Sequence, residues 1–247
     1  MLRPVQKRSL SDAVFEQLRE QIVRGAFQAG DSLPAERALC EALGVNRGAV
    51  REALKRLAQA RLVSVQHGGA SRVLDYRSSA GLELLSDLLV TEGGFDPKVV
   101  RSVIEMRSAL APDIARLAAL RGGERVADLL EPIVERMRAA GEDNRTLQTL
   151  AMEFWSALVD GTDNVAYRLA YNSLRQTYEK CMDILTGVLE DELRDLRSYA
   201  AIADAVRRGD AKRAERVART LTRRGEERLL AAAELLEAGR SPKGVAV

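Results

Sequence analysis

The chain has 247 residues, a length that allows one large domain or two smaller ones. Hydrophobic residues make up 46% of the chain, enough for a core, whereas aromatic residues make up only 4%. Two cysteines and a single histidine exclude a disulfide framework and a cysteine–histidine zinc cluster. Ala, Leu, Arg and Glu dominate, which favours helix.

Positive charge is concentrated at the N-terminal end. Residues 1–77 hold 13 Lys and Arg against 8 Asp and Glu, whereas the rest of the chain holds 25 against 28. This distribution indicates a polyanionic partner for the first part, although two ordinary solvated surfaces would give the same charges. Residues 1–10 lack the apolar stretch of a signal peptide, and no apolar run is long enough to span a bilayer. We therefore expect a cytoplasmic protein with no membrane partner.

The first 74 residues have the pattern of three helices and a hairpin in one domain. The first helix begins near Leu10 and ends at Gly25, and the second runs from Pro34 to Gly44. The third begins at Asn46, a favourable N-cap residue. Apolar and polar residues then alternate over 63–66, a Gly-Gly pair provides a turn at 68–69, and 71–74 return as a second strand.

The remainder of the chain is predicted to be helical. A polar linker is expected at 75–80, a helical domain over 81–240 and a flexible tail over 241–247. The predicted helices are 80–92, 97–121, 123–140, 142–160, 164–187, 189–208 and 210–238. Pro112 and Pro132 fall inside two of them and are expected to kink or shorten them. The fold class is therefore mostly α, with an all-helical antiparallel bundle as the C-terminal part.

The second and third helices, joined by a tight turn, form a predicted helix-turn-helix. In such motifs the N-terminal turn of the second helix enters the major groove of DNA. Arg47 and Arg51 lie there on one side of the helix, and Lys55 continues toward the phosphates. Arg is well suited to a bidentate contact with guanine. Arg37, early in the preceding helix, is placed to meet a phosphate or a base. From the spacing alone, solvated basic residues on an amphipathic helix are the alternative.

The segment "AGDSLPAERALCEALGVNRGAVREALKRLAQARLVSVQHGG" resembles the winged helix-turn-helix of GntR-family bacterial transcription regulators. The resemblance implies that His67 and Gly68, at the tip of the wing, contact the adjacent minor groove, whereas a solvated turn is the alternative. Gly48 and Ala49 stand where the family often has Thr, Ser or Pro, so hydroxyl contacts to DNA are missing there. The implied DNA-binding set is Arg37, Asn46, Arg47, Gly48, Ala49, Arg51, Lys55, His67 and Gly68.

The helical part resembles the effector domain of the FadR subfamily of these regulators. The resemblance rests on "EMRSALAPDIARLAAL" (105–120), "FWSALVDGTDNVAYRLA" (154–170) and "IADAVRRGDAKRAERVA" (202–218). Most members are similar in having an Asp and three His that hold a divalent metal, which binds a carboxylate ligand. The corresponding positions here are Ala151, Trp155, Tyr199 and a place near Leu221. Because these side chains cannot hold zinc or nickel in the usual way, we expect no metal cofactor.

An interior without metal ligands is more apolar and suits a hydrocarbon better than a small dicarboxylate. The metal-free fatty acid metabolism regulators of the subfamily bind long-chain acyl-CoA, and "VQHG" and "AGLELL" here are similar to theirs. Arg107, with Glu105 in a Glu-x-Arg pattern, either meets a phosphate or carbonyl of the ligand or forms a structural salt bridge. The candidate ligand residues are Arg107, Trp155, Asn164, Tyr178 and Tyr199. A filled, ligand-free core is the alternative.

The combined prediction is a homodimeric regulator that binds double-stranded DNA and is released from a palindromic operator, or re-positioned on it, by acyl-CoA. Its mechanism would be a population shift in which a helix of the bundle moves and the linker re-aims the DNA-binding domains. The same class of regulator responding to a small organic or sugar acid is the alternative. An enzyme is a distant third reading, because no nucleophile elbow, phosphate loop or Cys–His pairing is present in the sequence.

Overall fold

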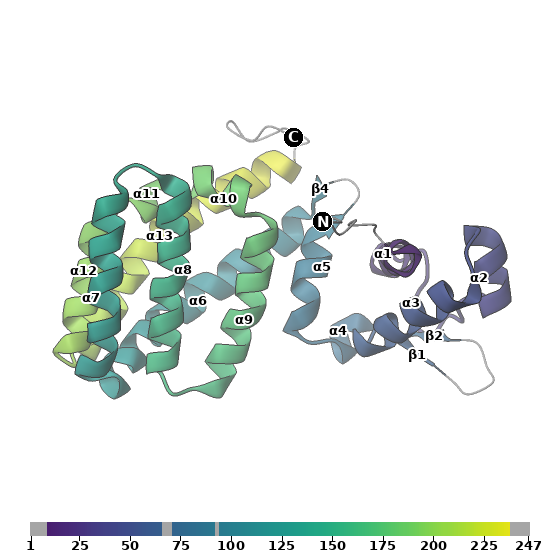
Figure 1. Ribbon diagram of the computed structural model, residues 1–247, viewed down its shortest axis with the longest axis horizontal. Coiled ribbons are helices and arrows are strands. Elements are labelled where there is room, and N and C mark those ends of the chain that lie inside the picture. Colours follow the sequence, from purple (N-terminus) through teal and green to yellow (C-terminus); the bar gives the residue numbers. More distant parts are fainter. Residues whose placement is uncertain (1–8, 66–70, 92–93, 238–247) are drawn as a thin grey trace, which may run out of the picture. The chain divides into compact units, whose positions relative to one another are not determined.

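The structure is a computed structural model that describes residues 9–65, 71–91 and 94–237. The chain divides into two compact units, Met1–Leu84 and Leu85–Val247, with helices as the main element of both (Figure 1). No helix of the described ranges is long and apolar enough to cross a membrane. Each unit is built around its own set of buried aliphatic side chains.

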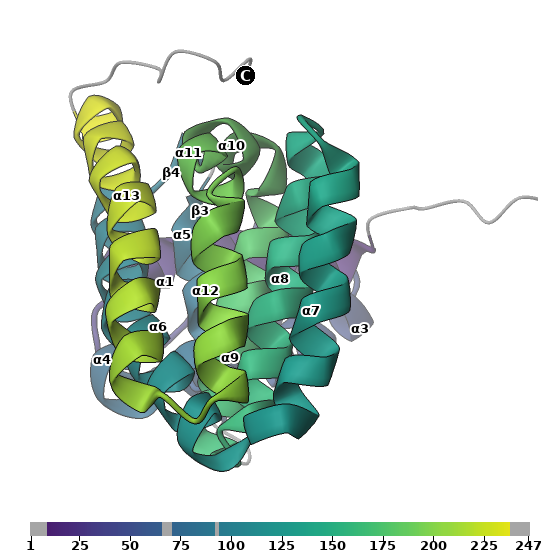
Figure 2. The ribbon, with the colours of Figure 1, turned by 90° about the vertical axis from the view of Figure 1, so that its left-hand side faces the viewer.

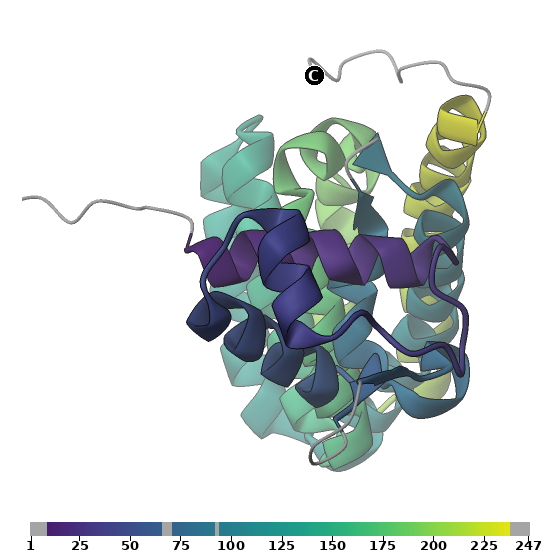
Figure 3. The same cartoon turned by 90° about the vertical axis from the view of Figure 1, so that its right-hand side faces the viewer.

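The first unit contains α1 (Leu10–Val23), α2 (Glu36–Leu43), α3 (Arg47–Gln59), β1 (Val63–Ser64) and β2 (Arg72–Val73). Helices α1 and α2 both pack against α3 (Figure 3). A capping box between Ser9 and Asp12 begins α1, and Gly44 ends α2 at a φ of 65°, a backbone conformation that glycine adopts without strain. Strands β1 and β2 are antiparallel, with Val63 opposite Val73.

The residues expected to form a polar linker, 75–80, instead include a helical turn, α4 (Tyr76–Ser79). The Asp75 side chain caps this turn by accepting a hydrogen bond from the Arg77 backbone N–H at 3.1 Å. The Ser79 hydroxyl donates to the Arg61 carbonyl oxygen at 2.9 Å, which ties α4 to the end of α3. Together with the short 3-10 turn η1 (Leu82–Leu84), α4 belongs to the first unit.

The second unit begins with α5 (Leu85–Leu89) and the small hairpin β3 (Val90–Thr91) and β4 (Gly94–Phe95). Its long helices are α6 (Pro97–Arg121), α7 (Gly123–Ala140), α8 (Asn144–Gly161), α9 (Val165–Lys180), α12 (Leu196–Arg207) and α13 (Ala211–Glu237). Between α9 and α12 lie two short helices, α10 (Met182–Val188) and α11 (Glu190–Leu193). Helix α13 packs along α6, and α12 lies between α13 and α7 (Figure 2).

Several predicted helices differ from those observed. The helix expected at 164–187 is interrupted at Cys181, and that expected at 189–208 is interrupted at 194–195. At the second break the Asp195 side chain accepts a bond from the Ser198 backbone N–H, which starts α12 as a new helix. The helix expected at 80–92 is replaced by η1, α5 and β3. Neither Pro112 nor Pro132 ends its helix, because packing on neighbouring helices offsets the lost backbone bond.

Candidate DNA-binding surface and effector pocket

The N-terminal turn of α3 forms the centre of the candidate DNA-binding surface. The Asn46 side chain caps the helix by accepting a hydrogen bond from the Ala49 backbone N–H at 2.9 Å. Arg47, Arg51 and Lys55 follow at four-residue spacing, and all three are exposed. The structure therefore brings the predicted basic residues of α3 onto one solvent-facing side of the helix.

Most of these cations have an acidic partner on the same surface. Arg51 pairs with Glu36 of α2 at 2.9 Å between Nε and Oε2, and its side chain is 64% exposed. Arg37 pairs with Glu41, and Lys55 pairs with Glu52, each at 3.0 Å. Among the described residues Arg47 has no such partner. Because exposed ion pairs contribute about 1 kcal/mol or less, a DNA phosphate can replace the carboxylates at little cost.

The predicted DNA-binding positions differ in their exposure. Ala49 is only 8% exposed and belongs to the core between the helices, so it offers DNA little area, and its N–H is taken by Asn46. Gly48 is exposed, and a Cβ there would lie 3.2 Å from the capping oxygen of Asn46. His67 and Gly68 lie outside the described residues.

The second unit contains an apolar cavity of about 80 Å³ between α6, α8, α9 and α11. Its wall is mostly aliphatic and aromatic, and it includes Leu110, Ile114, Ala151, Met152, Trp155 and Leu174. Polar groups reach it from four helices, among them Arg107, Gln148, Tyr178 and Glu192. Such a small set of polar groups in an apolar wall is typical of a site for a small organic ligand.

Three of the five predicted ligand residues line this cavity: Arg107, Trp155 and Tyr178. Burial raises the pKa of Tyr178 to about 12, so its hydroxyl stays protonated. Tyr199 is fully buried in the core, edge-to-face against Phe154 at 5.0 Å between ring centroids, and is not part of the cavity wall. Asn164 is not part of it either, because its side chain caps α9 by accepting from the Ala166 backbone N–H at 3.0 Å.

Arg107 forms a salt bridge with Glu192 of α11, the structural role given above as the alternative to ligand binding. Glu192 is 3% exposed, and burial raises its pKa, an effect that the Arg107 charge offsets only in part. Neither Glu192 nor Gln148 was predicted from the sequence. Glu192 lies in the run "EDEL", which looks like the solvated face of a helix, and its burial depends on the break that separates α11 from α12.

The positions that correspond to metal ligands in the FadR subfamily do not fit a metal here. Ala151 lines the cavity beside Trp155, while Leu221 is fully buried. Alkyl, indole and buried phenol groups do not replace imidazole and carboxylate as ligands. Over the described ranges, no group of three or more His, Cys, Asp or Glu is placed to hold a metal ion.

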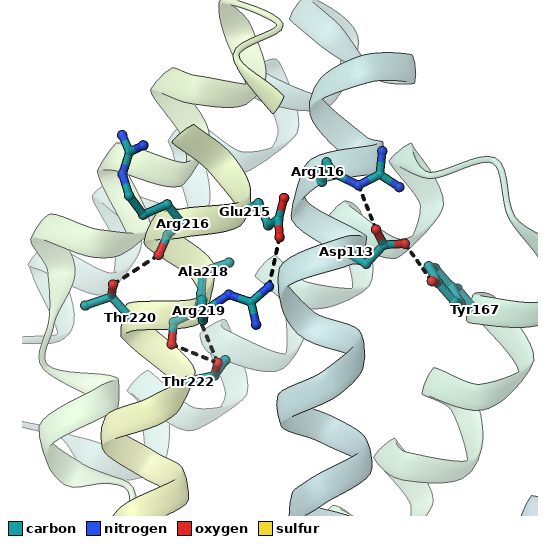
Figure 4. A network of polar contacts seen from close by, with 9 residues as sticks. All are labelled: Asp113, Arg116, Tyr167, Glu215, Arg216, Ala218, Arg219, Thr220 and Thr222. Carbon is teal, nitrogen blue, oxygen red and sulfur yellow. Dashed lines mark hydrogen bonds and ion pairs between the residues drawn. The ribbon is translucent and has the colours of Figure 1, made fainter. Parts of the chain in front are cut away.

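Polar bonds attach the first half of α9 to the bundle. The Tyr167 hydroxyl donates to Asp113 of α6 at 2.6 Å, and Asp113 also accepts from Arg116 at 2.7 Å (Figure 4). On the side of α8, Arg168 donates to the Ser156 carbonyl oxygen and the Tyr171 hydroxyl to the Met152 carbonyl oxygen, both at 2.7 Å. The Arg116 hydrogen bond, followed by that of Tyr167, holds the pKa of Asp113 below its ordinary value. Helix α9 is thus fastened beside the cavity at its N-terminal end.

A basic helix-turn-helix joined to a helical domain with an apolar cavity defines a ligand-responsive type of DNA-binding protein. Residues 10–73 match the model of the bacterial regulatory proteins of the gntR family, and residues 102–224 match that of the FCD domain. The chain is 39% identical over 230 residues to the HTH-type transcriptional regulator Mce2R of Mycobacterium tuberculosis, which covers 93% of this chain and 95% of that protein. The chain belongs to the GntR family and is a transcription regulator rather than an enzyme.

Other relatives differ in the metabolism that their names mention. The chain is 27% identical over 225 residues to the galactonate operon transcriptional repressor of Escherichia coli, covering 89% of this chain and 96% of that one. It is 28% identical over 163 residues to the fatty acid metabolism regulator protein of Pectobacterium carotovorum, covering 66% of each. Among solved structures, Lar of Listeria monocytogenes covers 92% of this chain and 99% of that one, with a TM-score of 0.57 and 15% identity, a likeness of fold.

Proposed function

We propose that this regulator is a cytoplasmic homodimer that binds a palindromic operator through α3. When long-chain acyl-CoA enters the cavity of the second unit, the protein is released from the operator or re-positioned on it. The observation that carries the proposal is the cavity itself, whose wall is mainly aliphatic and aromatic with Arg107 at one side. An apolar wall favours a hydrocarbon, and the guanidinium donor of Arg107 suits the carbonyl oxygen of an activated acid. The fatty acid metabolism regulator among the relatives is consistent with this ligand.

A small organic or sugar acid is the second candidate. The galactonate operon repressor, which matches a larger share of the chain, favours it. A sugar acid, however, needs several hydrogen-bond partners for its hydroxyl groups, and burying them unpaired is unfavourable. The cavity offers few such partners, since most of its wall is apolar.

The cavity is small for a long acyl chain in the conformation described. Its volume of about 80 Å³ is well below the roughly 300–1,000 Å³ that is usual for sites of drug-sized ligands. Ligand entry must therefore widen the cavity, and α9, which supplies Leu174 and Tyr178 to the wall, is the helix placed to move. Helix α9 also packs against α5, which starts at the first residue of the second unit. Movement of α9 would thus reach the segment that follows the DNA-binding unit.

Ligand-dependent release of DNA tests this proposal. An operator is first selected from random-sequence duplexes with the full-length protein, and its binding is followed by fluorescence anisotropy. Addition of palmitoyl-CoA is expected to weaken operator binding at least about tenfold, whereas free coenzyme A and galactonate leave it unchanged. Release by galactonate without release by palmitoyl-CoA would favour the second candidate. No response to either compound would contradict the effector role of the cavity.

A further inference from the structure

The cavity wall contains a buried ion pair whose two opposite charges cancel each other. Arg107 of α6 and Glu192 of α11 both line the cavity, and their side chains are 12% and 3% exposed. The second cation of the wall, Arg175, pairs with Glu179 of the same helix at 3.4 Å. Each arginine that faces the cavity therefore already has a carboxylate partner. A ligand meets no unbalanced positive charge in this wall.

Glu192 is held in place from two sides. One carboxylate oxygen accepts from Arg107, and the other lies against Gly225 of α13, where a Cβ atom would collide with it. The same hypothetical Cβ would come within 2.8 Å of the Leu189 side chain. Gly225 thus makes room for the carboxylate, and α13 behind it prevents Glu192 from withdrawing further. A second anion entering the cavity cannot easily displace it from Arg107.

Three polar atoms of residues in the wall lack a hydrogen-bond partner. Arg107 Nη1 is buried without a hydrogen bond, and so are Nε2 of Gln148, a residue that is 2% exposed, and Oε2 of Glu192, the oxygen that lies against Gly225. The Gln148 amide oxygen contacts the hydroxyl of Thr186, which also contacts the Met182 carbonyl oxygen. Since that hydroxyl has one proton, a reversed amide is equally consistent, and one end of Gln148 stays unpaired either way. Buried groups of this kind gain most from a ligand that completes their hydrogen bonds.

We propose that Glu192 is a built-in counter-ion that makes the effector cavity selective for uncharged ligand groups with a carbonyl, such as a thioester, ester or amide, and against free carboxylates. The inference rests on the proposed function and specifies which chemical form of an acyl ligand is sensed. A neutral carbonyl oxygen can accept from Arg107 Nη1 while Glu192 keeps its own bond. A carboxylate would instead place two negative groups beside one guanidinium in an apolar cavity, which disfavours its charged form.

The chain provides a reporter for the test. Trp155 is its only tryptophan, and it lines the cavity. Octanamide and octanoate have the same length and nearly the same shape but differ in charge at neutral pH. Titrated into the full-length protein and followed by Trp155 fluorescence, octanamide is expected to bind at least about tenfold more tightly than octanoate. Equal affinities of the two compounds, or no fluorescence change with either, would overturn the inference.

Glu192→Gln removes the negative charge and keeps the shape of the side chain. With Arg107 unbalanced, octanoate is expected to become the preferred ligand by about tenfold or more. Glu190→Gln is the matched control, because Glu190 lies in the same short helix but forms an exposed pair with Arg194. This control should keep the preference for octanamide. An unchanged preference in Glu192→Gln would contradict the role of Glu192.

Removing one partner of a buried pair can prevent folding, so a second variant is needed. Arg107→Met combined with Glu192→Met replaces the pair with apolar side chains and is expected to weaken octanamide binding at least about tenfold, since the donor is lost. Undiminished octanamide binding in that variant would overturn the inference. The two proposals can fail separately. If palmitoyl-CoA releases the operator but octanamide and octanoate bind equally well, the proposed function stands and the role of Glu192 as a counter-ion is overturned.

Discussion

Asp113 illustrates how one side chain fastens a helix of the effector domain. It accepts hydrogen bonds from Arg116 within α6 and from Tyr167 of α9, and these bonds hold its pKa below the ordinary value. A carboxylate whose pKa is lowered by folding stabilises the native state above its unfolded pKa, and this stabilisation is lost as the pH falls through the folded pKa. The attachment of α9 should therefore weaken in acid.

We predict that Tyr167→Phe lowers the free energy of unfolding by about 1 kcal/mol at pH 7, because a half-buried bond to a charged acceptor is lost. The difference between wild type and variant should shrink as the pH falls below the ordinary aspartate pKa of about 4 and on through the lowered pKa of Asp113 in the folded protein. Urea unfolding at several pH values measures it. Tyr171→Phe is the control, because the Tyr171 hydroxyl donates to a neutral backbone carbonyl. A pH-independent difference for Tyr167→Phe would contradict the assignment.

At this scale the sequence allowed only part of the site to be predicted. The exposed basic residues of α3 follow from their four-residue spacing on a helix with a recognisable N-cap. Trp155 could be assigned to the ligand site from its position in a segment that resembles the FadR subfamily. Glu192 could not, since its contact with Arg107 joins residues 85 positions apart through a helix break that no glycine or proline marks. Asn164 was expected to bind the ligand, but its side chain caps the N-terminus of α9 instead.

Close packing between helices depends on small residues at a few positions. Gly161, the last residue of α8, lies over Val126 of α7, and a Cβ at Gly161 would be 2.7 Å from the Val126 side chain and 3.4 Å from that of Ala118. All three residues belong to helices of the main core. A methyl group added there has no space unless α7 and α8 separate.

Gly161→Ala is therefore expected to destabilise the protein by about 1–3 kcal/mol through overpacking. The matched change is Gly187→Ala in α10, where a Cβ meets nothing within 4 Å. That variant should be neutral or more stable by up to about 1 kcal/mol, since alanine is the better helix former. Thermal unfolding followed by circular dichroism compares them. A stable Gly161→Ala variant would show that α8 is not packed as described.

Helix ends were predicted correctly where the sequence has a clear end signal, such as a glycine or an N-cap residue. Gly44, Asn46 and Gly141 mark helix ends in the sequence, and the structure has helix ends there. The break between α9 and α10 at Cys181 has no such signal, because the surrounding residues continue a helical pattern. The fold class, a helix-turn-helix with wing strands followed by a helical domain, was confirmed by the family models.

For the whole molecule, the uneven charge distribution determines how it meets DNA. The first 77 residues hold an excess of Lys and Arg, and the rest a small excess of Asp and Glu. Binding through the first part releases counterions from DNA, so affinity should fall steeply with salt. The acidic remainder adds no attraction of its own, and the basic surface of α3 has to supply the specificity.

We predict that Arg47→Ala lowers the preference for operator over unrelated duplex at least about tenfold, because a contact to a base edge is lost. Arg208→Ala is the control, since Arg208 is exposed in the second unit and pairs with Asp204. Anisotropy titrations between low and moderate salt give affinity and salt slope for both. Full operator preference in Arg47→Ala would contradict the placement of α3 in the major groove.

The attachment of α9 has a mechanical consequence. Tyr167, Arg168 and Tyr171 fasten its first half to α6 and α8, whereas Tyr178, further along the same helix, faces the cavity. At about 1.5 Å rise per residue, Tyr178 lies roughly 10 Å beyond Tyr171. A tilt of about 10° around Tyr171 would therefore move Tyr178 by roughly 2 Å. If α9 pivots at Tyr171 in this way, the domain can admit a ligand while the contacts of α6 with α13 and of α7 with α12 stay intact.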